Sequence, residues 1–85
     1  MKTIHKYSLN IGDTYIHLPL SAKCLHVDFQ NGNLQAWFEV ETSEGTEQRQ
    51  LSVFSTGQSI WDNLSYIGTA VTEDGSFVAH VYELK

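Results

Sequence analysis

Apolar and polar side chains alternate along most of the chain, and this two-residue period is typical of β-strands with one face in a core. Gly, Asn and Asp interrupt the alternation every 10 to 15 residues or so, about the spacing expected of turns in an all-β domain. The pattern predicts an all-β, β-rich fold of about seven short antiparallel strands, arranged as a small sandwich or a partly open barrel. The predicted strands are Thr3–Leu9, Thr14–Leu18, Lys23–Gln30, Leu34–Glu41, Gln48–Ser55, Tyr66–Thr72 and Ser76–Leu84.

The stretch from Gly57 to Leu64 breaks the alternation. Ser59 is a suitable helix N-cap, and Ile60 and Leu64 are four residues apart, so both would lie on one side of a helix. We therefore expect one short helical turn at residues 59–64. So short a helix is not stable alone, and it must dock against the rest of the domain.

The segment HVDFQNGNLQAWF contains Asn31-Gly32 between two alternating runs, which is the strongest local signal for a two-residue β-hairpin. With Gln30 opposite Asn33, the apolar residues of both strands share one face, and Trp37 stands opposite His26 on the other. A shift of one residue would turn the whole apolar set outward, so the register is well specified. The inner face expected from this register is Leu25, Val27, Phe29, Leu34, Ala36 and Phe38.

Two further alignments extend this core. The turn Asn10–Asp13 predicts a hairpin between the first two strands, and the loop after Thr42 predicts that strand 48–55 lies beside strand 34–41. The expected neighbours are Tyr7 with Ile16, His5 with Leu18, Leu51 with Phe38, and Val53 with Ala36.

The Asp74-Gly75 turn predicts a last hairpin with Glu73 opposite Ser76. Both of its faces carry apolar groups, so the pair is either central in the fold or part of an interface. The expected neighbours are Val71 with Val78, Thr69 with His80, and Ile67 with Tyr82.

The same registers predict an outer face with two large aromatic side chains, Trp37 and Phe54, bordered by polar groups. Aromatic anchors within a hydrated rim are typical of a protein-interaction surface. The candidate binding residues are Trp37, His26, Phe54, Asp28, Gln35 and Glu39. Two alternatives stay open: residues 58–64 cover Trp37 and form a second small core, or Trp37 is exposed without binding anything.

The 85 residues are enough for a single domain, 1–85, with one core. The net charge of −5 argues against direct binding of nucleic acid and permits docking on a basic protein surface. The lone Cys24 excludes an internal disulfide. No apolar run is long enough for a signal peptide or a membrane span, so we expect a soluble intracellular protein.

No group of residues in the sequence has the spacing of a catalytic or metal site. The four histidines show no ligand spacing, and there is no phosphate-binding loop and no nucleophile motif. Glu39 and Glu41 share a strand face, where exposed carboxylates usually only solvate the surface. We predict no enzyme activity, no metal and no cofactor.

Several strings together carry a resemblance that covers nearly the whole chain: TIHKY at Thr3–Tyr7, LHV at Leu25–Val27, QNG at Gln30–Gly32 with Trp37, YIGT at Tyr66–Thr69, and FV followed by HVYE at Phe77–Glu83. In this order and spacing the chain resembles a family of small phage and prophage proteins known only as a domain of unknown function. The resemblance implies a phage or prophage origin and a place of action in the host cytoplasm, and brings no activity with it.

These observations favour a non-enzymatic, phage-derived protein that binds a host protein complex and blocks it, for instance an anti-CRISPR-type anti-defence inhibitor. One alternative is a module that binds a small molecule such as a nucleotide signal. Another is an accessory protein of the phage particle, forming homo-oligomers through the hairpin at residues 66–83.

Overall fold

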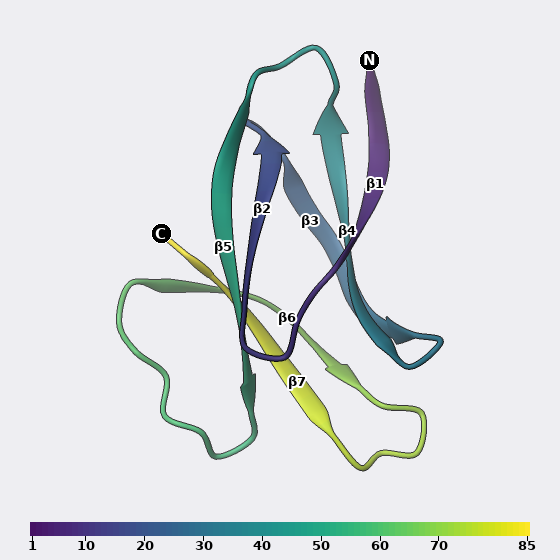
Figure 1. The fold of residues 1–85 in the computed structure, drawn as a ribbon, viewed down its shortest axis with the longest axis vertical. Helices are drawn as coiled ribbons and strands as arrows, with labels where there is room; N and C mark the ends of the chain where they lie inside the picture. Colours follow the sequence, from purple (N-terminus) through teal and green to yellow (C-terminus); the bar gives the residue numbers. More distant parts are fainter.

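Two antiparallel sheets face each other in the computed structural model, which describes residues 1–85 (Figure 1). The three-stranded sheet has the order β1-β4-β3, and the four-stranded sheet has the order β2-β5-β7-β6. The strands are β1 (Lys2–Ser8), β2 (Asp13–Pro19), β3 (Lys23–Gln30), β4 (Asn33–Glu41), β5 (Thr46–Ser55), β6 (Leu64–Val71) and β7 (Val78–Leu84). The all-β prediction is confirmed, as a two-layer sandwich that does not close into a barrel. No helix long and apolar enough to cross a membrane is present.

The β3–β4 hairpin has the predicted turn. Asn31 and Gly32 both have positive φ angles, 53° and 82°, as the central residues of a type I′ turn require. The predicted pairs are found for Gln30 with Asn33, Phe29 with Leu34, Val27 with Ala36, and His26 with Trp37.

A β-bulge between Cys24 and His26 ends this agreement. Cys24, and not Leu25, lies opposite Phe38, because the bulge adds one residue to β3. The prediction that Leu25 belongs to the inner face is therefore wrong, and its side chain is nearly half exposed.

The predicted hairpin between the first two strands is also wrong. β1 pairs with β4, where Tyr7 lies opposite Ala36, and β2 pairs with β5, where Ile16 lies opposite Arg49. The first two strands thus belong to different sheets, and neither Tyr7 with Ile16 nor His5 with Leu18 forms a cross-strand pair.

The connection after β1 carries the chain from one layer to the other. Leu9 N donates to Leu34 O at 2.9 Å, which continues the β1–β4 pairing past the end of β1. Three residues later Val53 N donates to Gly12 O at 2.8 Å, which begins the pairing of β2 with β5. Gly12 has a φ of 118°, a conformation that favours glycine at this crossing.

The prediction that β5 lies beside β4 is wrong as well, because β5 lies between β2 and β7. Leu51 and Val53 are buried in the same core as Phe38, but they reach it from the opposite layer. The alternation correctly identified the face of β5 that is buried, but it does not specify which strand is the neighbour.

Residues 58–63 form no helix, so the predicted helical turn is wrong. Gly57 and Asn63 at the two ends of this segment have φ angles of 90° and 67°, which are not helical. Between them the chain makes a wide excursion from the end of β5 to the start of β6 (Figure 1).

The β6–β7 hairpin has the predicted pairs Val71 with Val78 and Thr69 with His80. A second β-bulge, between Tyr66 and Gly68, places Tyr66 opposite Tyr82. The predicted pair of Ile67 with Tyr82 is therefore wrong. β6 packs against β3 of the other sheet without a hydrogen-bonded ladder. Gly68 allows this approach, since a Cβ there would lie only 2.8 Å from Val27 Cγ2.

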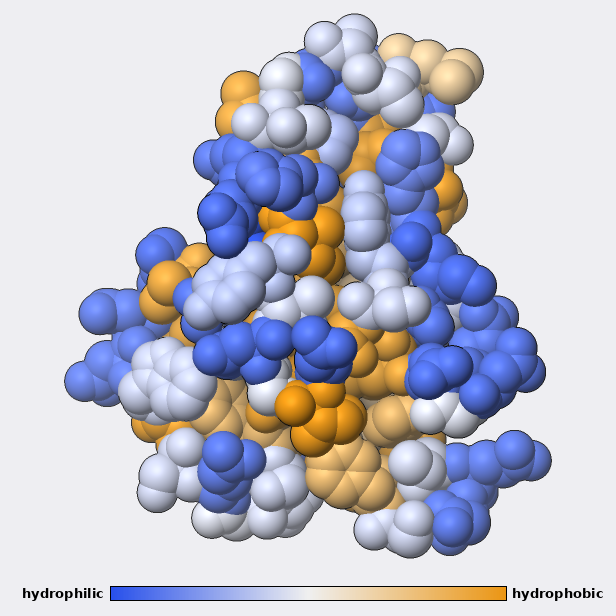
Figure 2. All heavy atoms as spheres, viewed as in Figure 1, coloured by the Kyte–Doolittle hydropathy of each residue, from blue (hydrophilic) through white to orange (hydrophobic).

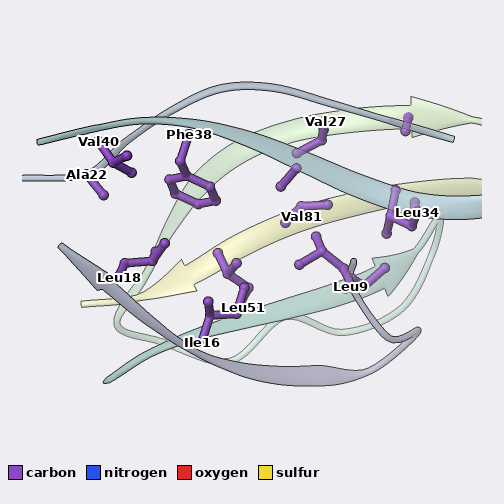
Figure 3. Packing of buried hydrophobic residues seen from close by; sticks show 14 residues of the cluster. Leu9, Ile16, Leu18, Ala22, Val27, Leu34, Phe38, Val40, Leu51 and Val81 are labelled. Atoms are coloured by element: carbon purple, nitrogen blue, oxygen red, sulfur yellow. The ribbon is translucent and has the colours of Figure 1, made fainter. Parts of the chain in front are cut away.

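The core lies between the two layers and consists of apolar side chains from six of the seven strands and from the loops after β1 and β2. Figure 3 shows Val40, Phe38 and Val27 on one side of this layer of side chains and Leu18, Ile16 and Leu51 on the other. Phe38, Leu18 and Leu51 are fully buried.

An ion pair closes one end of the core. The guanidinium of Arg49 donates to both carboxylate oxygens of Glu83, at 2.5 and 2.9 Å, and to the carbonyl oxygen of Ala22 at 2.9 Å. Arg49 also lies over the ring of Phe38, with Cζ 5.7 Å from the ring centroid. The hydrogen bonds that Arg49 donates to Glu83 raise the pKa of Arg49 above its ordinary value.

Candidate interaction surfaces

Trp37 lies on the outer face of the three-stranded sheet, at the centre of a row formed by one residue from each strand. Lys6 of β1 and His26 of β3 are its cross-strand neighbours. The rings of His26 and Trp37 are 5.7 Å apart between centroids, so the predicted contact between them is present. His26 Nε2 is also 3.5 Å from a carboxylate oxygen of Asp28. We call this outer face of β1, β4 and β3 the Trp37 face.

The polar residues predicted around Trp37 lie on this face but differ in their exposure to solvent. Gln35 is buried, and its Oε1 accepts a hydrogen bond from Ser8 Oγ at 3.1 Å. Asp28 is exposed, and Glu39 is half-buried, 3.8 Å from Lys2 Nζ.

Phe54 is the one predicted binding residue that the structure removes from the Trp37 face. It lies on the outer side of the four-stranded sheet, because β5 pairs with β2 and β7 and not with β4. Its side chain is fully buried on that side by Trp61, whose ring centroid is 4.8 Å away in an edge-to-face contact. The segment 58–63 therefore covers Phe54 on the four-stranded sheet, and Trp61 does not cover Trp37 on the other sheet.

Four aromatic rings form a continuous run on the outer side of the four-stranded sheet. Trp61 contacts Phe54, Phe54 contacts Tyr82 at 5.6 Å, and Tyr82 contacts Tyr66 at 5.4 Å, all edge to face. The two ends of the run are the exposed members, with 49% of Trp61 and 59% of Tyr66 accessible to solvent. We call the surface formed by Trp61, Phe54, Tyr82 and Tyr66 the aromatic face.

A chain of hydrogen bonds runs beside these rings. The hydroxyl of Tyr66 is 2.6 Å from Thr69 Oγ1, which is 3.1 Å from His80 Nδ1, and His80 Nε2 is 2.8 Å from Thr56 Oγ1. Both ring nitrogens of His80 are thus satisfied by hydroxyl groups. The chain fixes the orientation of Tyr66 and ties the start of the 56–63 segment to the sheet.

The two outer faces differ in charge. The Trp37 face carries three lysines, Lys2, Lys6 and Lys23, and three carboxylates, Asp28, Glu39 and Glu41, so its formal charge is balanced. The remaining two basic and seven acidic residues of the chain lie outside the Trp37 face, and they account for the whole net charge of −5. No lysine or arginine occupies an outward position on the four-stranded sheet.

No group of three or more His, Cys, Asp or Glu side chains is placed to hold a metal ion. Cys24 is half-buried and its Sγ lies 3.7 Å from the carbonyl oxygen of His26. Burial raises the pKa of this thiol, which opposes formation of the reactive thiolate. The largest hollow, about 710 Å³, lies beside the ion pair of Arg49 and Glu83, where the two charges satisfy each other.

A family model for a domain of unknown function, DUF7352, matches residues 1–85. The chain belongs to the DUF7352 family. Comparisons with curated proteins and with solved structures give no match. The expected membership of a family known as a domain of unknown function is confirmed.

Sequence reasoning missed the aromatic face. Tyr82 and Tyr66 meet only because of the bulge after Tyr66, and Trp61 reaches Phe54 through an irregular segment. One signal was available in the sequence. Apolar residues occur on both faces of the predicted strand at 78–84, which indicated apolar contacts on each side of it.

Proposed function

We propose that this DUF7352 chain is a non-enzymatic protein-binding domain and that it binds with the aromatic face. The observation that carries the proposal is the run of four edge-to-face rings whose end members, Trp61 and Tyr66, are half exposed. Trp and Tyr supply much of the binding energy in protein interfaces. Because the hydrogen bonds and ring contacts already orient these side chains, little conformational entropy is lost on binding.

The charge distribution supports a partner with a basic surface. The outward positions around the rings lack lysine and arginine, and the acidic excess lies entirely outside the Trp37 face. An arginine of the partner can stack on Tyr66 or Trp61 while the net charge of −5 accelerates the encounter. Figure 2 shows one face of the domain, on which hydrophobic residues reach the surface along the middle of the view and hydrophilic residues lie on both sides.

The partner we propose is a host protein complex that the domain blocks, as an anti-CRISPR-type anti-defence inhibitor would. The sequence resemblance to phage and prophage proteins supports this part of the proposal. A domain without catalytic groups inhibits by occupying a surface that the complex needs, so tight binding alone is sufficient.

Affinity capture from a lysate of the host tests the proposal, with Tyr66→Ala and Trp37→Ala as matched variants. Both residues lie on outer faces, so both variants are expected to fold. We expect Tyr66→Ala to lose the partner and Trp37→Ala to retain it. Loss with Trp37→Ala and retention with Tyr66→Ala would assign binding to the other face.

A second candidate function rests on the row Lys6, Trp37 and His26. Two stacking rings beside a lysine suit a nucleotide, whose base would lie on Trp37 and whose phosphate would pair with Lys6. The aromatic face has no cation for a phosphate, which makes the Trp37 face the better place for such a ligand. Thermal-shift screening against nucleotides tests this candidate, and a shift that Trp37→Ala abolishes would support it. No shift with any nucleotide would contradict it.

A further inference from the structure

The outer edge of β2 has free backbone hydrogen-bonding groups at defined positions. Val53 N donates to Gly12 O, and Leu20 N donates to Gly45 O, on either side of the β2–β5 ladder. In an antiparallel ladder every second residue bonds to the neighbouring strand, so Thr14, Ile16 and Leu18 bond to β5. The N–H and C=O groups of Tyr15 and His17 therefore point away from the sheet. Pro19, which has no N–H, occupies the next outward position, where it costs no ladder bond.

Between Thr14 and Leu18 this edge lacks the charged residues and prolines that usually prevent strands from pairing. The corresponding edge of the other sheet, β1, carries Lys2 and Lys6, whereas residues 14–18 of β2 carry no lysine, arginine or carboxylate. Three large apolar side chains follow the β2 edge and are each more than half exposed: Ile11, Tyr15 and Leu20. The remaining two edges, of β3 and β6, pack against each other.

We propose that a second copy of this chain pairs with this edge, β2 against β2, around a two-fold axis at Ile16. In that register Tyr15 of each copy lies opposite His17 of the other, and both residues have free backbone groups. Two such pairs form four hydrogen bonds, and a shift of the register by one residue would place Tyr15 and His17 opposite residues whose backbone groups already bond to β5. The two four-stranded sheets then become one continuous sheet of eight strands.

The chemistry of the edge fits a second copy because the segment is self-complementary. Tyr15 and the second copy's His17 form an aromatic cross-strand pair, and Thr14 lies opposite Leu18 with no charge on either. The two-fold axis is perpendicular to the sheet, so both aromatic faces lie on one side of the dimer. The pairing does not depend on the proposed function. The hairpin at residues 66–83 offers no such edge, since β7 is flanked by β5 and β6, and β6 lies along β3.

Amide hydrogen exchange at two protein concentrations tests the pairing on the unmodified chain. We expect the amides of Tyr15 and His17 to become protected only at the higher concentration. The amides of Thr14, Ile16 and Leu18 serve as the internal control, because β5 protects them at both concentrations. Equal and fast exchange of Tyr15 and His17 at all concentrations up to the millimolar range would overturn the proposal.

Light scattering on two substitutions gives an independent readout. The intact chain should change with concentration from 9.6 kDa to twice that mass. His17→Pro removes an outward N–H without removing a bond to β5, and we expect it to raise the dimer dissociation constant on the order of tenfold or more. His17→Ala removes the same side chain but keeps the N–H, and should dimerise. The proposal would be overturned if folded His17→Pro still dimerises, or if the intact chain is strictly monomeric. If His17→Pro fails to fold, the hydrogen-exchange measurement decides alone.

Discussion

Trp61 packs edge to face on Phe54, with 4.8 Å between the ring centroids, and this contact decides which outer face the 58–63 segment covers. The segment docks on the four-stranded sheet and leaves the Trp37 row of the other sheet uncovered by Trp61. The domain thus has two unlike outer faces, one aromatic and without cations, and one with balanced charge around a single tryptophan.

Phe54 is expected to act as a core residue although it lies outside the main core. Phe54→Ala should lower the free energy of unfolding by about 3–5 kcal/mol, because its side chain is fully buried. Trp61→Ala should cost about 1–2 kcal/mol, since half of that side chain is already exposed. Urea denaturation measures both values. Equal costs would show that Trp61 is buried to the same degree in solution.

Gly68 is expected to control the contact between the two sheets at β3 and β6. Gly68→Ala places a methyl group 2.8 Å from Val27 Cγ2, and we expect a loss of about 1–3 kcal/mol in the free energy of unfolding. Gly45→Ala is the matched control, because nothing lies within 4 Å of a Cβ there, and it should stay within about 0.5 kcal/mol. In the Gly68→Ala background, Val27→Ala should cost less than it does alone.

Arg49 and Glu83 are expected to behave as a coupled pair. Both side chains are largely buried, so Arg49→Ala or Glu83→Ala leaves an unpaired charge and should cost about 3–5 kcal/mol. The double variant should cost clearly less than the sum of the two single costs, because it leaves no unpaired charge. Strict additivity in urea denaturation would contradict the coupling.

Asp74 is expected to give the β6–β7 turn a specific dependence on pH. Hydrogen bonds from the backbone N–H and hydroxyl of Ser76, and from Thr72, lower the pKa of Asp74 to about 2 from its ordinary 3.8. A carboxyl whose pKa is lowered by folding stabilises the native state above its unfolded pKa. This stabilisation is therefore present above about pH 4 and is lost as the pH falls toward 2.

Asp74→Ala should accordingly be less stable than the intact chain at neutral pH, and the difference should disappear near pH 2. Thermal unfolding at a series of pH values measures this convergence. Glu73→Ala is the control, because that side chain forms no hydrogen bond in the turn. A difference for Asp74→Ala that is independent of pH would contradict the proposed cause.

The alternation of the sequence predicted local structure well and strand neighbours poorly. The Asn31-Gly32 hairpin was predictable because its turn and register are set by adjacent residues. The partners of β1, β2 and β5 were not, because an apolar face can pack in either layer of a sandwich and the same alternation suits both. The two bulges, at Leu25 and Ile67, shift the register by one residue and leave no mark in the pattern.

In the candidate site, too, local contacts were predictable and contacts between strands distant in sequence were not. His26 and Trp37 were predicted as neighbours from one local register, and the structure places them so. Phe54 was assigned to their face through a non-local pairing that does not exist. The aromatic face was not predicted, because it combines two strands across a bulge with an irregular loop.

The most direct test of the central claim is the affinity of the captured partner for three forms of the chain: intact, Tyr66→Ala and Trp37→Ala. We expect Tyr66→Ala to weaken binding on the order of tenfold or more, as for a buried interface tyrosine, and Trp37→Ala to change it by less than about twofold. Undiminished affinity of folded Tyr66→Ala would contradict the assignment of binding to the aromatic face.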